Sequence, residues 1–359
     1  MNRSLLVAVL MVVLLISTGC PKPLSVNDVY HAQADTLIDE AAHFKNSLEW
    51  WYFTGHLEDT LTKDQYGIEY VFFHFNPRDK SDYMMGNVAL SDPQKQRFTY
   101  DYKIIKRDSL LTPVLPLELQ INSGKQNWEL QGQHGSYHLK AQMRRHPGFG
   151  VDLTTTPGSG AWLHGGGSGY QRYGKYAEAG YYSYPELAAE GLLFIDGNPK
   201  YVRGNLWYDR QWNCIGVYQK EVAWDWMAIQ LDGGEELMVF KLYHRGDQKV
   251  IYGGSFRNAQ GQSQTLGTQD IIIEELAYWK SPKSKVEYPV DWLVKVPALD
   301  LSLNVQARFP EQELSLKFAA LVSLHYWEGM STVRGTHERD TVNGRAYVEL
   351  TNRKWIKNE

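Results

Sequence analysis

Two stretches of this 359-residue chain occur twice, and this internal repeat restricts the possible folds more than any other feature. Residues 202–210 and 342–350 share a valine, a glycine two places on, and then an aromatic residue followed two places later by an acid. Residues 50–58 match residues 224–232, and a Gly-x-Glu run follows each of these copies. Each half therefore contains an aromatic opening strand and a closing strand with one acid. We predict a tandem repeat.

Short aromatic segments between turn sequences predict strands through most of the chain. Trp, Tyr and Phe number 12, 23 and 12, and these residue types fit a pleated, half-buried surface. Turn sequences such as residues 122–124 and 196–199 separate the segments at short intervals, as in antiparallel barrels and sandwiches. Residues 288–303 alternate apolar and polar side chains and predict one further pair of strands. Residues 269–278 are the best candidate for a helix.

The N-terminus has the pattern of an export signal. Arg3 precedes an apolar run over residues 5–16, which is too short to cross a hydrocarbon core of about 30 Å. The run ends in Ile-Ser-Thr-Gly-Cys, which resembles a bacterial lipobox with Cys20 as the acylated residue. We therefore predict a signal peptide over residues 1–19, lipidation of Cys20 and a tether over residues 20–42. Ordinary signal-peptide cleavage beside an incidental cysteine is the alternative.

The residues around Cys20 and the overall charge indicate the compartment and the class of partner. Pro21 after Cys20 favours the outer membrane of a Gram-negative cell, so we expect a lipid-anchored protein of the cell envelope, at its periplasmic face. Cys214 is the only other cysteine, so a lipidated Cys20 leaves no internal disulfide. The net charge is −4 and the basic residues are scattered, which argues against a nucleic-acid partner.

Each copy of the closing strand places an acid beside an aromatic residue on one face. Side chains two residues apart point the same way on a strand, so Asp209 lies beside Trp207, and Glu349 beside Tyr347. A buried aromatic neighbour raises the pKa of a carboxyl group, which can then donate a proton near neutral pH. Hydration of an alkene needs such a donor, followed by capture of the cation by water. Asp209 and Trp207 are therefore predicted catalytic residues.

Ion pairing is the alternative role for both acids. Asp209 would then pair with Arg203 or Arg210 at a barrel end. Glu349 would pair with Arg345 in the same way. Ion-pair networks perturb carboxyl groups as readily as active sites do, so the sequence leaves both interpretations open.

Residues near the repeated strands are predicted to line a cavity. Trp50, Tyr52 and His56 share a face of the first opening strand, and a polar tip among aromatic rings suits a binding site. We predict that His56 holds water or relays a proton beside Asp209; a hydrogen bond to the backbone at a barrel end is the alternative. The predicted ligand-binding residues are Trp50, Tyr52, Trp327, Glu328, Tyr347 and Glu349.

Four other histidines suggest an esterase site and a metal site, but the surrounding sequence supports neither. His164 opens a His-Gly-Gly-Gly run like the oxyanion hole of some esterases, but no serine has glycine both two places before and two places after it. We expect a loop at a barrel mouth there. His134, His138 and His146 lack a cluster of acidic or cysteine ligands, so we expect solvent-facing histidines, no metal and no cofactor.

Five motifs together resemble the family of carotenoid hydratases (hydroxyneurosporene synthases) and AttH-like proteins. They are Glu49–Tyr52, Tyr181–Ser183, Val202–Trp212, Tyr326–Gly329 and Tyr347–Thr351. The resemblance implies an all-β chain of two tandem, antiparallel, lipocalin-like barrels, which we place at residues 43–215 and 216–355. It also matches Asp209 and Trp212 to residues of a family motif, whereas Gln211 stands where the family commonly has Glu.

The resemblance implies two possible functions. The first is an exported lipoprotein that binds an apolar ligand (terpenoid, polyene or lipid) in a lipocalin-like cavity, with hydratase or isomerase activity. The second is a non-catalytic accessory lipoprotein of an ABC transport system. One fold supports both functions, so the choice between them depends on particular residues. Asp209 favours catalysis, whereas Gln211 and the predicted lipid anchor at Cys20 favour the accessory role.

Overall fold

Antiparallel strands make up almost all of the chain that the structure describes. The computed structural model describes residues 40–43, 48–75, 83–106, 114–123, 126–215, 222–319 and 322–353. The predicted signal peptide, Cys20 and the tether up to residue 39 lie outside these residues. The strands of the first half are β1 (Leu48–Asp59), β2 (Gln65–Phe75), β3 (Tyr83–Asp92), β4 (Arg97–Lys106), β5 (Leu117–Ser123), β6 (Gln126–Gln133), β7 (Ser136–Gln142), β8 (Gly150–Pro157), β9 (Trp162–Leu163), β10 (Tyr170–Tyr173), β11 (Ala177–Ile195) and β12 (Asn198–Ile215).

The second half continues with strands and one short 3-10 helix. Its elements are β13 (Val222–Leu231), β14 (Glu236–His244), β15 (Lys249–Arg257), β16 (Ser263–Leu266), β17 (Ile272–Lys280), β18 (Glu287–Val296), η2 (Pro297–Leu299), β19 (Leu301–Ala307), β20 (Glu313–Ala319), β21 (Val322–His337) and β22 (Asp340–Thr351). The strands predicted at residues 288–303 are confirmed as β18 and β19.

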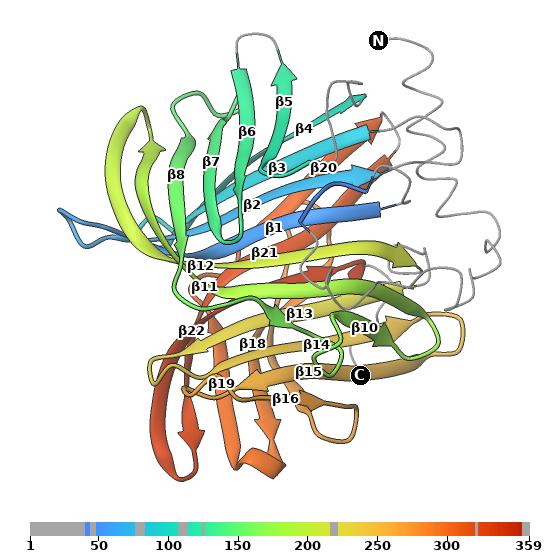
Figure 1. The fold of residues 1–359 in the computed structure, drawn as a ribbon. Coiled ribbons are helices and arrows are strands. Elements are labelled where there is room, and N and C mark those ends of the chain that lie inside the picture. Colours follow the sequence, from blue (N-terminus) through green and yellow to red (C-terminus); the bar gives the residue numbers. More distant parts are fainter. Residues whose placement is uncertain are drawn as a thin grey trace.

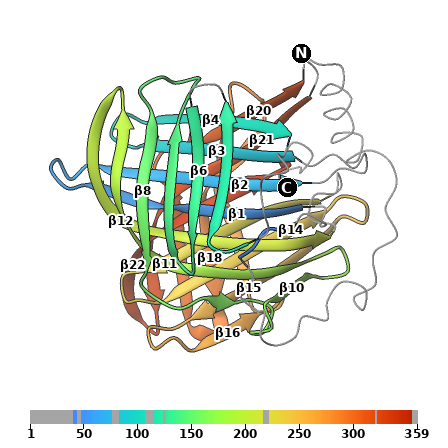
Figure 2. The same cartoon turned by 45° about the horizontal axis from the view of Figure 1, so that its top comes forward.

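The strands form two sheets with the same topology. The first has the order β4-β3-β2-β1-β12-β11-β8-β7-β6-β5, with β9 and β10 beside β11. The second has the order β16-β15-β14-β13-β22-β21-β19-β18-β17, with β20 beside β21. In Figures 1 and 2, β5–β8 fold over β1–β4 and nearly close the first sheet into a barrel, while the second is a half-barrel. The predicted fold of two tandem antiparallel lipocalin-like barrels is confirmed.

The strand register places the two predicted acids at equivalent positions. On the pair β1–β12, Tyr52 lies opposite Asp209. On the pair β13–β22, Trp226 lies opposite Glu349, and Trp226 is the repeat partner of Tyr52. The prediction that the acids occupy like places on their closing strands is therefore confirmed. The predicted boundary between residues 215 and 216 lies at the edge of the described residues and stays a prediction.

Side-chain alternation divides each strand between a barrel interior and a layer between the barrels. On β1, Trp51 and Phe53 pack inside the first barrel, whereas Trp50 and Tyr52 belong to a separate cluster that includes Trp226 of β13. The second barrel has its own interior, formed by residues such as Ile229, Trp292 and Val348. Both interiors are filled by large side chains, and the opposite strand faces meet between the barrels.

The predicted helix at residues 269–278 is wrong. This segment contains β17, which pairs antiparallel with β18. Its three consecutive isoleucines, residues 271–273, are β-branched, so they lose side-chain freedom in a helix and fit a pleated surface. The backbone of β18 supplies hydrogen-bond partners from a segment more than ten residues away, which local periodicity does not detect.

Candidate functional site

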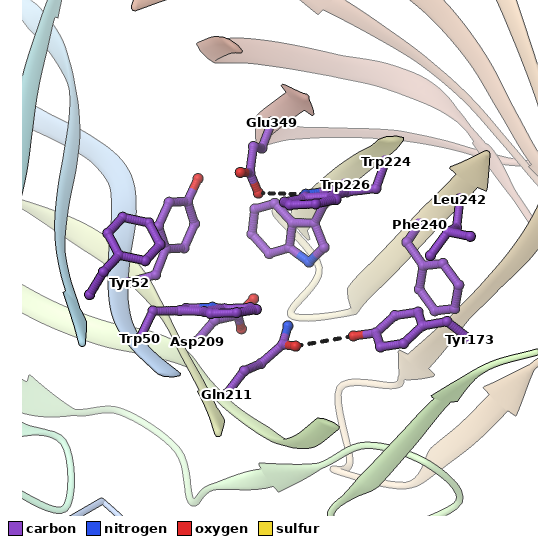
Figure 3. A pocket seen from close by; sticks show the side chains of 11 residues that line it. Trp50, Tyr52, Tyr173, Asp209, Gln211, Trp224, Trp226, Phe240, Leu242 and Glu349 are labelled. Carbon is purple, nitrogen blue, oxygen red and sulfur yellow. Dashed lines mark hydrogen bonds between the residues drawn. The ribbon is translucent and has the colours of Figure 1, made fainter. Parts of the chain in front are cut away.

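A pocket lined mainly by aromatic side chains lies between the two barrels (Figure 3). The first barrel contributes residues of β1, β2, β10 and β12, and the second contributes residues of β13, β14 and β22. The lining residues are Trp50, Tyr52, Phe73, Tyr173, Asp209, Gln211, Trp224, Trp226, Phe240, Leu242 and Glu349. We had expected a cavity inside a barrel. The acids lie outside both interiors instead, because their positions alternate with those that fill the barrel cores.

Asp209 is a buried carboxyl group that accepts three hydrogen bonds. The Trp207 indole Nε1 donates to Oδ1 at 2.6 Å, and the Tyr181 hydroxyl donates to Oδ2 at 2.6 Å. The Ser183 hydroxyl also donates to Oδ1. Burial raises the pKa of Asp209 to about 7, although the three hydrogen bonds act in the opposite direction. Asp209 therefore changes its charge near neutral pH in a pocket lined mainly by aromatic side chains.

A chain of hydrogen bonds connects Asp209 to the second barrel. The ring of His164 lies between two serines, with Nε2 at 2.7 Å from the Ser183 hydroxyl and Nδ1 at 3.0 Å from the Ser255 hydroxyl. Since Ser183 donates to Asp209, it accepts from the Nε2–H of His164, which fixes the tautomer of the ring. Burial and the positive charge of Arg257 lower the pKa of His164 to about 3, so the ring is neutral.

The His-Gly-Gly-Gly loop inserts this histidine. Gly165, Gly166 and Gly167 all have positive φ angles of 64°, 74° and 80°, a backbone conformation that other residues rarely adopt. The loop is held to β11 by the backbone N–H of His164, which donates to the Tyr181 carbonyl at 3.2 Å. The loop conformation expected from the sequence is therefore confirmed, and the loop places His164 beside Ser183. Its expected position at a barrel mouth stays a prediction.

Glu349 brings a second carboxyl group to the same pocket from the other half of the repeat. The Trp224 indole Nε1 donates to its Oε2 at 3.1 Å (Figure 3). Burial raises the pKa of Glu349 to about 7, the Trp224 hydrogen bond lowers it, and the negative charge of Asp209 adds to the increase. Two carboxyl groups with pKa values near 7 therefore share one aromatic pocket, and each affects the titration of the other.

Ion pairing does not account for either acid. Arg210 pairs with Glu49 at 2.6 Å, inside the first barrel rather than in the pocket. Arg203 pairs with Glu190 at 3.1 Å near the surface. The Nε of Arg345 donates to the side-chain oxygen of Gln230 at 3.2 Å. Within the described residues, the arginines proposed as partners are thus occupied by other acceptors.

The structure brings several predicted residues together at the pocket. Trp50, Tyr52, Asp209 and Glu349 line it, and Trp207 contacts Asp209 from the same strand. Gln211, which stands where the related family commonly has Glu, accepts a hydrogen bond from the Tyr173 hydroxyl at 3.2 Å (Figure 3). These residues come from strands that are distant in sequence, and the register of β1 with β12 assembles them.

Glu328 and Tyr347 lie buried between the barrels beside this pocket. Glu328 is directly opposite Glu349 on β21, and its Oε2 accepts a hydrogen bond from the Tyr52 hydroxyl at 2.7 Å. Tyr347 is two residues before Glu349 on β22 and lies on the same face. Both are therefore neighbours of the pocket lining, although neither is part of it.

Two predicted residues are placed elsewhere. His56 is not among the residues that line the pocket; its Nε2 donates to the Ala346 carbonyl at 2.9 Å, and burial lowers its pKa to about 4. This is the backbone hydrogen bond that we considered as the alternative. Trp327 packs inside the second barrel, where its Nε1 donates to the Pro310 carbonyl at 2.8 Å. Alternation along β21 explains this, because Trp327 and Glu328 point to opposite faces.

The prediction missed several residues that complete the site. Tyr181 and Ser183 were noted as part of a motif, but their role as donors to Asp209 depends on the pairing of β11 with β12. His164 reaches the site from a loop, and no local pattern predicts that. The tryptophans of β13 were detectable, since Trp226 is the repeat partner of Tyr52.

The other histidines do not form a site. His134 lies in the turn between β6 and β7 with a φ of 53°, and His138 on β7 contacts Asp152 at 2.7 Å. In the described ranges, no group of three His, Cys, Asp or Glu side chains is arranged to hold a metal ion. Likewise, none of the helices in the described part of the chain has the length and apolar character needed to cross a membrane.

Fold and site together define a tandem lipocalin-like protein with an acidic, aromatic pocket between its barrels. A family model described as AttH-like matches residues 36–353, so the chain belongs to the AttH-like family. This result confirms the resemblance found in the sequence motifs.

Solved structures agree with this assignment. The crystal structure of a protein assigned as AttH from Nitrosomonas europaea is 25% identical and has a TM-score of 0.76, with 90% of this chain and 99% of that chain covered. Kievitone hydratase from Nectria haematococca is 16% identical with a TM-score of 0.66, over 88% of this chain and 94% of its own, and shares the fold.

One curated relative is a fungal enzyme. Dehydratase asqC from Emericella nidulans is 26% identical in an alignment of 211 residues that covers 55% of this chain. The match spans just over half of the dehydratase, 57% of its length. The similarity therefore relates part of this chain to part of an enzyme that removes water.

Proposed function

We propose that this protein binds a mainly apolar molecule (a terpenoid, polyene or lipid) in the pocket between its barrels and adds water to it or removes water from it. The observation that carries the proposal is the pair of buried carboxyl groups, Asp209 and Glu349, in one aromatic pocket. Both have a pKa of about 7, so one can be protonated while the other is ionised. The similarity to a dehydratase supports this class of reaction.

Hydration needs a proton donor, a cation-stabilising surface and a proton acceptor. In the proposed reaction Glu349 gives its proton to one alkene carbon, and a positive charge forms on the neighbouring carbon. The faces of rings such as Trp50 and Trp226 stabilise this charge. A water molecule adds to the cation and releases its proton to Asp209. One proton leaves the pair and one returns, so exchange between the two carboxyl groups restores the starting state.

The hydrogen bonds of the two acids support this division of roles. Asp209 accepts from three donors, an arrangement that stabilises a carboxylate, whereas Glu349 accepts from one and faces the carboxyl group of Glu328. In the dehydration direction the roles exchange, and Asp209 gives a proton to the leaving hydroxyl group. The sequence-based expectation was that Asp209 donates the proton in hydration; in the proposed reaction Glu349 takes that role, and Asp209 is the donor only in the reverse direction.

The test measures binding and turnover on the same variants. A panel of isoprenoid alkenes and tertiary alcohols is incubated with the protein, and gain or loss of water is detected by mass spectrometry. We expect Asp209→Asn to reduce turnover by about 100-fold or more, with affinity changed only a few-fold, because a proton-transfer group acts mainly in the transition state. Glu190→Gln is the matched control, since Glu190 lies outside the pocket. Unchanged turnover in Asp209→Asn refutes the assignment.

We further propose that the protein is held at the periplasmic face of the outer membrane through an acylated Cys20. This proposal rests on the lipobox-like sequence before Cys20. Replacement of Cys20 by Ala should move the protein from the membrane fraction to the soluble fraction or leave it unprocessed. An unmodified mature N-terminus at another residue, detected by mass spectrometry, contradicts it.

The accessory role in an ABC transport system is the second candidate. It is favoured by Gln211, which removes an ionisable group at a position where the family commonly has Glu, and by the predicted anchor. Under this alternative the pocket binds a hydrophobic cargo without changing it. Ligand recovered unchanged with the wild-type protein, together with copurification of a transporter, favours this role over catalysis.

A further inference from the structure

A second group of buried polar side chains lies beside the aromatic pocket. We call it the acid cluster and define it as Thr54 of β1, Glu69 of β2, Glu328 of β21 and Tyr347 of β22. Thr54 and Glu69 are directly opposite each other on the first sheet. The second sheet contributes Glu328 of β21 and Tyr347 of β22. The residue directly opposite Tyr347 is Met330, and Glu328 lies two residues before Met330 on the same strand. The cluster therefore forms where the two sheets face each other.

Most polar atoms of this cluster have no hydrogen-bond partner among the described residues. These atoms are both carboxyl oxygens of Glu69, Oε1 of Glu328, the Thr54 hydroxyl and the Tyr347 hydroxyl. Each of the four residues is at most 2% exposed. A buried polar group without a partner is costly, and native proteins leave few of them. Five unpartnered atoms in one place indicate that the cluster accommodates another polar molecule or group.

Among the described residues the cluster has no ion-pair partner of positive charge, which limits what it can bind. Within the described part of the chain, no Lys, Arg or His forms an ion pair with Glu69 or Glu328. Burial, followed by the neighbouring carboxyl groups, holds the pKa values of both acids well above their usual range. Protonated acids and hydroxyls donate and accept hydrogen bonds without net charge. Such a set suits a hydroxyl or carbonyl group and disfavours an anion.

The cluster and the aromatic pocket adjoin each other. Tyr52 lines the pocket with its ring and donates its hydroxyl to Glu328 at 2.7 Å. Glu349, which also lines the pocket, is the direct cross-strand neighbour of Glu328. Tyr52 and Glu349 therefore connect the two regions.

We propose that the acid cluster binds a neutral oxygen group of the substrate, a hydroxyl or a carbonyl, while the apolar part of the same molecule fills the aromatic pocket. The substrate is then an amphiphilic molecule, such as a phenol, an alcohol or an enone, rather than a pure hydrocarbon. The inference rests on the proposed function only in taking the pocket as the ligand site. The oxygen group fixes the position of the alkene relative to Asp209 and Glu349.

The test compares two probes that differ only in this group. 2-Naphthol and 2-methylnaphthalene have nearly the same shape, but only the first carries a hydroxyl. Titration calorimetry on the wild-type protein should show about tenfold tighter binding of 2-naphthol, because only this probe satisfies the unpartnered groups. Tyr347→Phe and Glu69→Leu should each reduce this preference to less than about threefold and leave the binding of 2-methylnaphthalene within about twofold.

Tyr182→Phe is the matched control. The Tyr182 hydroxyl is equally buried, but it lies inside the first barrel. This variant should keep the wild-type preference. A crystal structure of the complex should place the naphthol oxygen within hydrogen-bond distance of Glu69, Glu328 or Tyr347.

Three other outcomes would contradict the proposed binding of an oxygen group by the acid cluster. An unchanged preference in both Tyr347→Phe and Glu69→Leu overturns the inference, as does a cluster that holds only ordered water while the naphthol oxygen lies elsewhere. Either result leaves the catalytic proposal for Asp209 intact, since that proposal depends on turnover. If neither probe binds the wild-type protein, the pocket is not the ligand site, and the proposed function fails with the inference.

Discussion

Asp209 and Glu349 occupy equivalent positions in the repeat but have different neighbours. Opposite Asp209 on β11 stands Ser183, a hydroxyl donor held by His164. At the same place opposite Glu349, on β21, stands Glu328, a second carboxyl group. The repeat thus determines where an acid lies, and the strand beside it determines which polar neighbour the acid has. The Asp209 carboxyl group accepts three hydrogen bonds, whereas that of Glu349 accepts one, from Trp224.

The largest expected effect comes from removing both members of this pair. Asp209→Asn and Glu349→Gln should each reduce turnover by about 10²- to 10⁴-fold, because general acid and base groups contribute factors of that size. The double variant should be little worse than either single variant, since the two groups act in one reaction. Steady-state kinetics on the three variants checks this. Multiplicative losses would show that the two acids act independently.

A second prediction concerns the dependence of stability on pH. The folded-state pKa of each acid is raised from its ordinary value to about 7, so the stabilising contribution is fully present below about pH 4 and is lost as the pH rises through 7. Each carboxyl group adds a slope of up to roughly 1.4 kcal/mol per pH unit in this window. Urea unfolding between about pH 4 and pH 8 should show a flatter profile for the Asp209→Asn/Glu349→Gln double variant than for the wild type.

A third prediction concerns Ser183, the neighbour of Asp209 on β11. Ser183→Ala removes one donor from the Asp209 carboxylate, so the pKa of Asp209 should rise by about one unit. The acidic limb of the pH–rate profile for hydration should then move to higher pH. His164→Gln, which disturbs the orientation of Ser183, should move the limb in the same direction by a smaller amount. A loss of rate without a shift of the limb would indicate a purely structural role.

The smallest effect is expected from substitution of Glu328, the neighbour of Glu349 on β21. Glu328→Ser gives Glu349 a hydroxyl neighbour like that of Asp209, so the pKa of Glu349 should fall by less than about one unit. Thr332→Ser on the same strand serves as a control at a more distant, half-buried position. An unchanged Glu349 titration in Glu328→Ser would mean that the cross-strand neighbour does not set its charge state.

The tandem arrangement could be predicted because the repeat is visible in the sequence without knowledge of strand pairing, whereas the lipocalin-like form of the barrels was implied by the family resemblance. The Trp, Tyr and acid positions of β1, β12, β13 and β22 recur in order, and alternation along each strand correctly placed Trp207 beside Asp209. The helix predicted at residues 269–278 was wrong because its partner strand β18 decides the conformation.

The site was predicted only in part, for a related reason. Side-chain alternation gives two faces but does not say which face enters a barrel, so the pocket was expected in a barrel and Trp327 was assigned to the ligand. His164, Tyr181 and Ser183 reach Asp209 through a loop and through cross-strand pairing. Contacts of this kind depend on tertiary structure, so local patterns in a single sequence do not predict them.

The most direct test of the account is a ¹³C NMR titration of the Glu349 carboxyl group, assigned by comparison with Glu349→Gln. If the two acids share one buried pocket, Glu349 titrates with a midpoint near pH 7 in the wild type, because burial and the charge of Asp209 both raise its pKa. In Asp209→Asn that charge is absent, and the midpoint should move to lower pH. A Glu349 midpoint near the ordinary value of about 4.3, unchanged by Asp209→Asn, would contradict a coupled acid pair between the barrels.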